Sequence, residues 1–362
     1  MSQTELSPNL QSHIKQIKTD VDRELGLYWD LKISEAAKID PQYKRLLTEM
    51  KKFSLRGGKR LRPFMAFLGF QIAGGKDYKA FLRIALVWEM YHLFAIMHDD
   101  IMDQDEQRYG GLNVAGVYNR LFKRSHDDHV AHSHSLNMAL IAGDIALGFA
   151  HEILDSSMID SDTRDQLKRL LNKLHFQLAA GQMLDDLAGI DGHLNPDKIK
   201  KIYLLKTARY SMIAPMQSGA IVVGGNQTIL DILERYGYHA GIAYQIVDDL
   251  LGMYGSTREI GKPNITDLRE GKKTLLMYYG FQFADETQKV VLKKYFGNPN
   301  IGPAELKIVR KILTENGAKA KTIFMAHDEA EKAKKAIGKL ALPGGLGDEF
   351  INFTDYLISR TK

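Results

Sequence analysis

Two acidic clusters close apolar stretches of the chain, and their residue types and spacing could do chemistry. In HLFAIMHDDIMDQDE, residues 92–106, Asp99 and Asp103 fall about one turn apart on one face if the segment is helical. Asp248 and Asp249 in YQIVDDLLG form the second cluster. Carboxylates in apolar surroundings repel one another, so a cation is expected between them. No cysteine or metal-spaced histidine accompanies them, which favours Mg²⁺ shared with a diphosphate.

Basic residues stand where a diphosphate would need donors. GGKRLRP, residues 57–63, places Lys59 and Arg62 three apart, on one face if helical, behind a glycine pair that lets the backbone approach an anion. Further donors are Lys206, Thr207, Lys262 and Lys272. One GGK alone is weak evidence, but together with two acidic clusters it predicts a site for metal ions and phosphate groups.

The elements that must position these residues are expected to be helices. Apolar residues recur at three- and four-residue spacing over 82–97, 136–153, 199–223 and 229–253, and alternating strand patterns are scarce. Segments within the first and last of these ranges are apolar on nearly all sides, as central helices of a bundle are. The sequence therefore predicts an all-α bundle of long antiparallel helices with polar side chains projecting into its core.

The amino-acid composition limits the classes of protein to which this chain could belong. The 362 residues are 44% hydrophobic and 26% charged, and no linker or repeat divides them, so a single domain over 1–362 is expected. Cysteine is absent, and neither a signal peptide nor a membrane span is recognisable, which favours a cytoplasmic protein. The net charge of +5 falls in short separate clusters without interleaved aromatics, so no nucleic-acid partner is expected.

From about residue 50 to residue 280 the sequence resembles the trans-isoprenyl diphosphate synthases of the polyprenyl synthetase family. The motifs that carry the resemblance, in the family's order and spacing, are GGKRLRP, HDDIMDQDEQR, AGD at 142–144, GQMLD at 181–185, KTARY at 206–210, and YQIVDDLLG followed by GKP and DLREGKKT. The resemblance implies an isoprenoid synthase fold with a deep central cavity, usually a homodimer. It also implies head-to-tail condensation of isopentenyl diphosphate with an allylic diphosphate, and a short-chain all-trans product that partitions to the membrane.

The same resemblance implies a role for each matching residue. Two or three Mg²⁺ ions, with Mn²⁺ as a substitute, would be ligated or oriented by Asp99, Asp103 and Asp248, supported by Asp100, Asp249 and Asp185. The allylic diphosphate would be held by Arg108, Lys206, Lys262 and Lys272. Isopentenyl diphosphate would be bound by Lys59, Arg62 and His92. The reacting centre would be lined by Thr207 and Gln245.

Three features depart from or refine the family pattern. Tyr109 stands where a second arginine usually follows Arg108, so one contact to isopentenyl diphosphate is missing. Gly252 replaces a third aspartate, as in many members. Four histidines, expected to lie in a solvated loop or else to bind a metal or sense pH, occur in KRSHDDHVAHSHS, residues 123–135.

Product length is the last expectation. In relatives an aromatic residue five positions before the acidic motif forms the floor of the cavity, and here that residue is Phe94, with Tyr91 behind it. Ala95 leaves room that an aromatic would remove, so geranylgeranyl diphosphate is expected, with farnesyl diphosphate next. Two alternatives remain open. A class I terpene cyclase would lack the second diphosphate site, and a non-catalytic subunit of a heteromeric synthase would not turn over alone.

Overall fold

The structure, a computed structural model, describes residues 6–190, 195–255, 265–338 and 345–359, most of them helical. The all-α fold class is confirmed. The elements are α1 (Pro8–Ile39), α2 (Pro41–Arg56), α3 (Leu61–Ile72), α4 (Tyr78–Met102), β1 (Gln107–Arg108), β2 (Gly111–Leu112), α5 (Val114–Phe122), α6 (Asp128–Asp155), α7 (Ser161–Ile190), α8 (Pro196–Ile202), the π-helix η1 (Tyr203–Ile213), α9 (Ala214–Ile221), α10 (Gln227–Tyr254), α12 (Thr266–Arg269), α13 (Leu275–Phe283), α14 (Glu286–Tyr295), α15 (Pro303–Glu315), α16 (Ala318–Ile337) and α17 (Leu346–Ser359).

Short polar side chains begin the helices that carry the site. Asp77 accepts hydrogen bonds from the backbone N–H groups of Lys79 and Ala80 and so caps α4. Asn226 caps α10 in the same way. The two capping residues therefore fix where α4 and α10 begin, which the apolar residues of these helices do not do by themselves.

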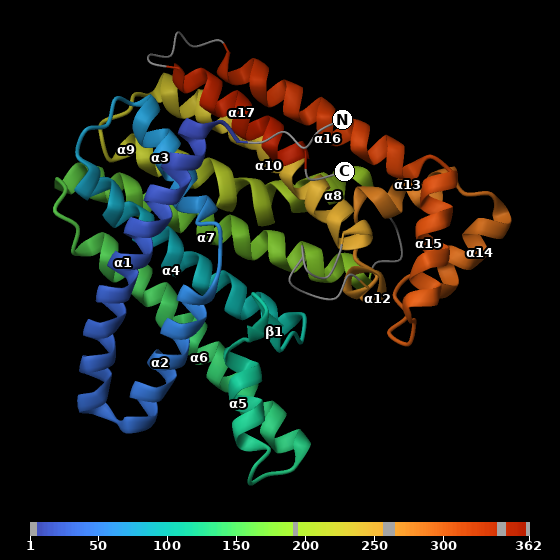
Figure 1. Ribbon diagram of the computed structural model, residues 1–362, viewed down its shortest axis with the longest axis horizontal. Coiled ribbons are helices and arrows are strands. Elements are labelled where there is room, and N and C mark those ends of the chain that lie inside the picture. The colour runs from blue at the N-terminus through green and yellow to red at the C-terminus, as the bar shows by residue number, and fades with distance from the viewer. Residues whose placement is uncertain (1–5, 191–194, 256–264, 339–344, 360–362) are drawn as a thin grey trace.

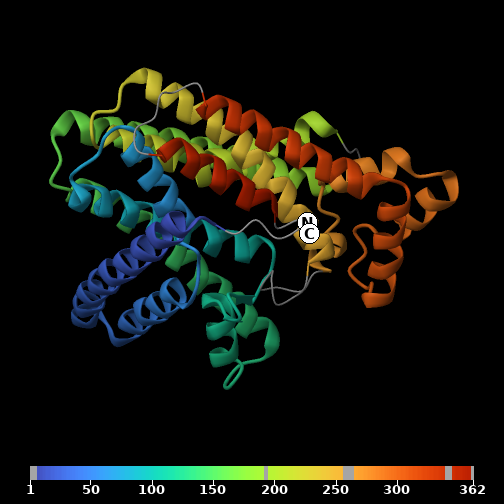
Figure 2. The same ribbon diagram turned by 45° about the horizontal axis from the view of Figure 1, so that its top comes forward.

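The two helices that end in acidic residues are the core of the bundle. Helix α4 lies between α3 and α6, and α10 packs against η1 and α16 (Figures 1 and 2). Almost every residue of α4 from Phe81 to Met97 is buried, as its sequence predicts. One apolar cluster surrounds α4 and another surrounds the second half of α10. The prediction of one domain over 1–362 stays a prediction.

Two expected segments differ in detail. The stretch 199–223, expected as one helix, is built from α8, η1 and α9, and the π-helix η1 carries the KTARY motif. The segment 123–135 is a turn only as far as Asp127, because Asp127 caps α6 through the N–H of Val130. Of the four histidines, His129, His132 and His134 therefore lie on a helix, and the expectation of a loop is wrong for them.

Among the residues that the structure describes, two helices are long and apolar enough to cross a membrane. They are α4, whose most apolar window is 67% buried inside the protein, and α6, whose window is 33% buried. The more exposed face of α6 is considered again below.

Candidate active site

A large cavity receives the polar residues that the sequence singles out. Its volume is about 1830 Å³, and its walls come from the start of α3, from α1, α4, α6, α7, η1, α10 and α17, and from the loops before α3 and α13. The predicted site residues that line it are Lys59, Arg62, His92, Phe94, Ala95, Asp99, Asp103, Arg108, Lys206, Thr207, Gln245, Asp248, Asp249 and Lys272. Tyr91 and Asp100 lie behind the wall, and Lys262 lies outside the described residues.

The two carboxylates of the first acidic pair have different surroundings. Asp99 borders the cavity, with its Oδ1 3.2 Å from Nζ of Lys206 and its Oδ2 3.6 Å from Arg108. Asp100 points inward and accepts hydrogen bonds from Arg108 at 2.6 Å and Asn113 at 2.9 Å. Burial raises the pKa of Asp100 to about 6, although Arg108 opposes the rise. Asp100 therefore fixes the guanidinium of Arg108 beside the cavity.

The two carboxylates of the second acidic pair also have different surroundings. Asp248 is exposed and lines the cavity, whereas Asp249 is buried. Asp249 accepts hydrogen bonds from the hydroxyl of Tyr203 and from Nε2 of Gln245, the latter at 2.9 Å. Burial raises the pKa of Asp249 to about 7. Asp100 therefore holds Arg108 and Asp249 holds Gln245, and the further prediction that these two carboxylates support metal binding stays a prediction.

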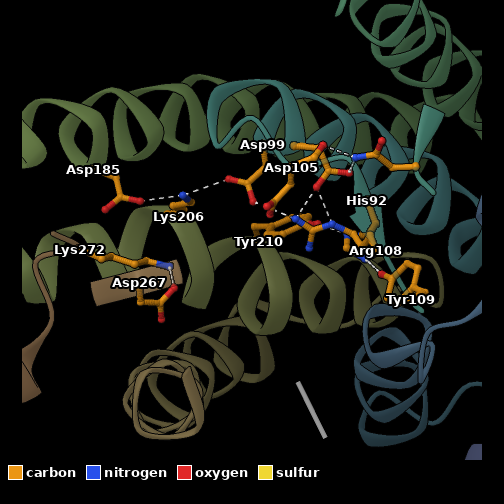
Figure 3. Close-up of polar contacts among 12 residues, drawn as sticks. His92, Asp99, Asp105, Arg108, Tyr109, Asp185, Lys206, Tyr210, Asp267 and Lys272 are labelled. Atoms are coloured by element: carbon orange, nitrogen blue, oxygen red, sulfur yellow. Dashed lines mark hydrogen bonds and ion pairs between the residues drawn. The ribbon is translucent and has the colours of Figure 1, made fainter. Parts of the chain in front are cut away.

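Lys206 connects the acidic groups of different helices. Its Nζ lies 2.7 Å from Oδ2 of Asp185 on α7 and 3.2 Å from Asp99 on α4 (Figure 3). Burial alone would raise the pKa of Asp99, but Lys206 and Arg108 hold it below its ordinary value. Lys272 is paired with Asp267 at 3.9 Å, and this carboxylate raises the pKa of the Lys272 ammonium. The ammonium groups of Lys206 and Lys272 and the guanidinium of Arg108 are therefore held at fixed positions beside the acidic residues of the cavity wall.

The donor chemistry of the wall fits Mg²⁺. The groups that face the cavity are carboxylate oxygens of Asp99, Asp103 and Asp248, the hard oxygen ligands that Mg²⁺ prefers. Among the described residues, no three acidic or histidine side chains come together as a ready-made metal site. Because Mg²⁺ commonly shares a few carboxylates with substrate phosphates and water, this arrangement fits an ion that arrives with a diphosphate.

A hydrogen-bonded chain runs from the start of α13 to the cavity. The backbone N–H of Leu275 donates to the hydroxyl of Tyr203, which donates to Asp249. Asp249 accepts from the amide of Gln245, whose Oε1 accepts from the hydroxyl of Thr207 at 2.6 Å. The amide orientation of Gln245 is thereby fixed, and the lone pairs of the Thr207 oxygen are left to face the cavity.

A second group of polar residues occupies the other side of the cavity mouth. Arg62 donates to Ser211 at 2.9 Å and lies 3.9 Å from the ring centroid of Tyr210. His92 is hydrogen-bonded to Tyr210 through Nδ1 and to Tyr109 through Nε2, the latter at 3.2 Å. Burial and the charge of Arg62 lower the pKa of His92, so its ring is neutral. Nε of Arg62 is buried without an acceptor among the described residues, as expected beside an anion site.

Lys59 and Arg62 are not both on a helix. Lys59 lies in the loop before α3, while Arg62 is in the first turn of the helix, so the expected shared helical face is wrong. Gly58, at φ +95°, turns the loop, and both side chains still line one cavity.

Arg60, which the sequence reasoning did not assign, holds this loop. It adopts a left-handed backbone conformation, φ +51°, and its buried guanidinium contacts Glu89 at 2.5 Å, Asp22 at 2.6 Å and the carbonyl of Ser54 at 2.8 Å. These partners belong to α4, α1 and α2. Glu89, a lone acid within the apolar run of α4, was the signal that could have revealed this ion pair.

The comparisons with known proteins agree with this geometry. Residues 44–313 match the family described as polyprenyl synthetase. The chain is 30% identical over 84% of its length, and 91% of the relative, to geranylfarnesyl diphosphate synthase of Aeropyrum pernix. It is 31% identical over 78% of its length, and 80% of the relative, to geranylgeranyl diphosphate synthase of Sulfolobus acidocaldarius.

A solved structure has the same fold. The geranylgeranyl pyrophosphate synthase from Corynebacterium glutamicum, complexed with isoprenyl diphosphate and magnesium, superposes with a TM-score of 0.90 over 96% of this chain and 98% of that one, at 24% identity. Fold and site together define an all-α prenyltransferase. The chain belongs to the polyprenyl synthetase family, as its motifs predicted.

Removal of the Arg60 side chain tests the loop anchor. We expect Arg60→Ala to lower the free energy of unfolding by ~3–5 kcal/mol, because Glu89 would stay buried without a cation. Urea denaturation followed by circular dichroism measures this. Lys59→Ala, next to it and exposed, should change stability by less than ~0.5 kcal/mol. Equal losses in the two variants would contradict the anchoring role.

Proposed function

We propose that this protein condenses isopentenyl diphosphate with an allylic diphosphate, head to tail, in a Mg²⁺-dependent reaction that releases diphosphate and gives a short-chain all-trans prenyl diphosphate. The observation that carries the proposal is one cavity whose wall contains carboxylates, two groups of cationic side chains and many apolar side chains. Family membership and the activities named for the relatives support the same reaction.

Different residues would bind the two substrates. Arg108, Lys206 and Lys272, with Lys262 as the family predicts, would hold the allylic diphosphate and stabilise the charge it gains as it leaves. Bound Mg²⁺, held by Asp99, Asp103 and Asp248, would supply further charge neutralisation of the leaving group. Lys59 and Arg62 would hold isopentenyl diphosphate.

The reacting centre needs dipoles rather than a nucleophile. When the C–O bond of the allylic diphosphate breaks, the hydroxyl of Thr207 and the amide of Gln245 present oxygen dipoles toward the cation. The double bond of isopentenyl diphosphate then forms the new C–C bond, and a proton passes to the departed diphosphate. The apolar wall keeps out water that would otherwise capture the cation.

The alternatives differ in what they require of the cavity. A terpene cyclase has no use for a second group of phosphate-binding basic side chains, whereas Lys59 and Arg62 line the cavity in addition to Arg108, Lys206 and Lys272. A non-catalytic subunit would be expected to lose its aspartates, but Asp99 and Asp248 are both present and border the cavity. Turnover of the purified protein alone separates the three possibilities.

Metal removal tests the reaction directly. We expect excess EDTA to abolish condensation and Mg²⁺ or Mn²⁺ to restore it, because the leaving group needs neutralising. Asp99→Ala or Asp248→Ala should lower kcat by at least ~100-fold, the scale of losing a preorganised electrostatic group. The exposed Asp165→Ala, outside the cavity, serves as the control. Undiminished condensation in EDTA would exclude the proposed mechanism.

Tyr109 sets the affinity for isopentenyl diphosphate. We expect Tyr109→Arg to lower the KM for that substrate, because a guanidinium can bind phosphate oxygens in a bidentate fork. Tyr109→Phe keeps the ring but adds no charge, so its KM should not fall. Initial-rate kinetics with each substrate varied in turn measures both. An unchanged or raised KM in Tyr109→Arg would mean that this chain binds the substrate without a cation at that position.

Product length follows from the depth of the cavity. We propose geranylgeranyl diphosphate as the main product, with farnesyl diphosphate next, because Phe94 and the small Ala95 line the cavity one to two turns from Asp99. Phe94→Ala should lengthen the product by at least one five-carbon unit, as seen by chromatography of the dephosphorylated alcohols. A folded, active variant with an unchanged product would show that Phe94 does not limit the chain.

A second copy of the chain would cover an apolar stripe on α7. Exposed Phe176, Met183, Leu187 and Ile190 recur at spacings of seven, four and three residues along that helix, and exposed Leu140 and Ile141 lie on α6. We expect a homodimer with these helices at its interface, acting in the cytoplasm and releasing its product to membranes. Phe176→Asp should lower the sedimentation coefficient to that of a monomer, while the exposed Phe324→Asp should not.

A further inference from the structure

Two helices each contribute an aromatic or imidazole ring to the same part of the cavity wall. Phe94 on α4 and His175 on α7 both line the cavity, and their ring centroids are 5.5 Å apart. Building on the proposed function, we propose that His175 limits product length together with Phe94 by reaching across the cavity from the opposite helix. The motif-based expectation placed this limit on α4 alone.

Tyr91 holds His175 in place. The Tyr91 side chain is fully buried and does not line the cavity, but its hydroxyl lies 3.3 Å from Nδ1 of His175. Its ring also packs edge-on against Phe94, at 5.4 Å between centroids. Tyr91 therefore acts on the cavity through the two rings in front of it, which explains how a residue behind the wall can influence product length.

His175 lies at the depth where a growing chain would end. It precedes Asp185 by ten residues on α7, which is about 15 Å along the helix axis. Leu178 and Ala179 line the cavity between these two residues, and Ala95 lines it on the α4 side. Ala95 and Ala179 have small side chains that leave space for hydrocarbon, whereas Phe94 and His175 present rings to the same cavity.

The polarity of His175 adds to its size. Burial, together with the nearby His151 and His98, lowers the pKa of His175, so the ring is neutral. A hydrocarbon end pressed against this ring would have to displace it and break the hydrogen bond to Tyr91, leaving polar groups unpaired in an apolar site. His175 would therefore limit chain length in two ways, by the size of its ring and by the free-energy cost of breaking its hydrogen bond to Tyr91.

Product analysis of three variants tests the inference. His175→Ala should move the main product to at least one five-carbon unit longer than that of the unaltered protein. Tyr91→Phe, which keeps the ring of residue 91 and removes only its hydroxyl, should broaden the product distribution toward longer chains. His151→Ala is the control, because His151 belongs to the same histidine group but does not line the cavity. Active His175→Ala and Tyr91→Phe variants with unchanged products would overturn the proposal.

A binding measurement separates this inference from the proposed activity. By calorimetry, His175→Ala should bind geranylfarnesyl diphosphate at least ~10-fold more tightly than the unaltered protein does, the scale of burying one further five-carbon unit. The affinity for geranyl diphosphate should be unchanged. This result would support the inference even if no condensation were observed, whereas absence of turnover would by itself count only against the proposed activity. Equal affinity gains for both ligands, or none, would overturn the role of His175.

Discussion

The charge balance around Lys206 is the constraint on which the rest of the site depends. Its ammonium lies 2.7 Å from Asp185 and 3.2 Å from Asp99, and these carboxylates belong to two different helices (Figure 3). Acidic groups at the ends of apolar helices could not stay ionised there without a nearby cation. A diphosphate brings further negative charge to this wall, so metal ions that arrive with it would complement the fixed charges of Lys206, Arg108 and Lys272.

In each acidic pair, one carboxylate faces the cavity and its neighbour holds another side chain in place. Asp99 and Asp248 border the cavity, whereas Asp100 and Asp249 hold Arg108 and Gln245 from behind. Adjacent residues on a helix point about 100° apart, so a DD sequence supplies one outward and one inward carboxylate. The π-helix η1 then completes the second arrangement, because Tyr203 and Thr207 meet Asp249 and Gln245 at matching places on α10.

The sequence predicts much of this arrangement because its signals are local. Helical periodicity identified α4 and α10, and the motifs identified the cavity-lining lysines and aspartates. Pairings across helices were less accessible: Arg60 with Glu89, and Tyr91 with His175, are separated by 29 and 84 positions. The π geometry of η1 and the left-handed Arg60 depend on tertiary contacts, which no local pattern of residue types encodes.

The neutral group around His92 shows how the chain can accommodate Tyr109 in place of an arginine. The two nitrogens of His92 are engaged by Tyr109 and Tyr210, and Arg62 lies over the ring of Tyr210. Arg60 close by already carries a buried positive charge that Glu89 and Asp22 balance. Another guanidinium here would lie near the positive charges of Arg60, Arg62 and Arg108, which already act on residue 109. Tyr109 therefore leaves fewer positive charges close together in this region, and on the proposed function the contacts to isopentenyl diphosphate would come chiefly from Lys59 and Arg62.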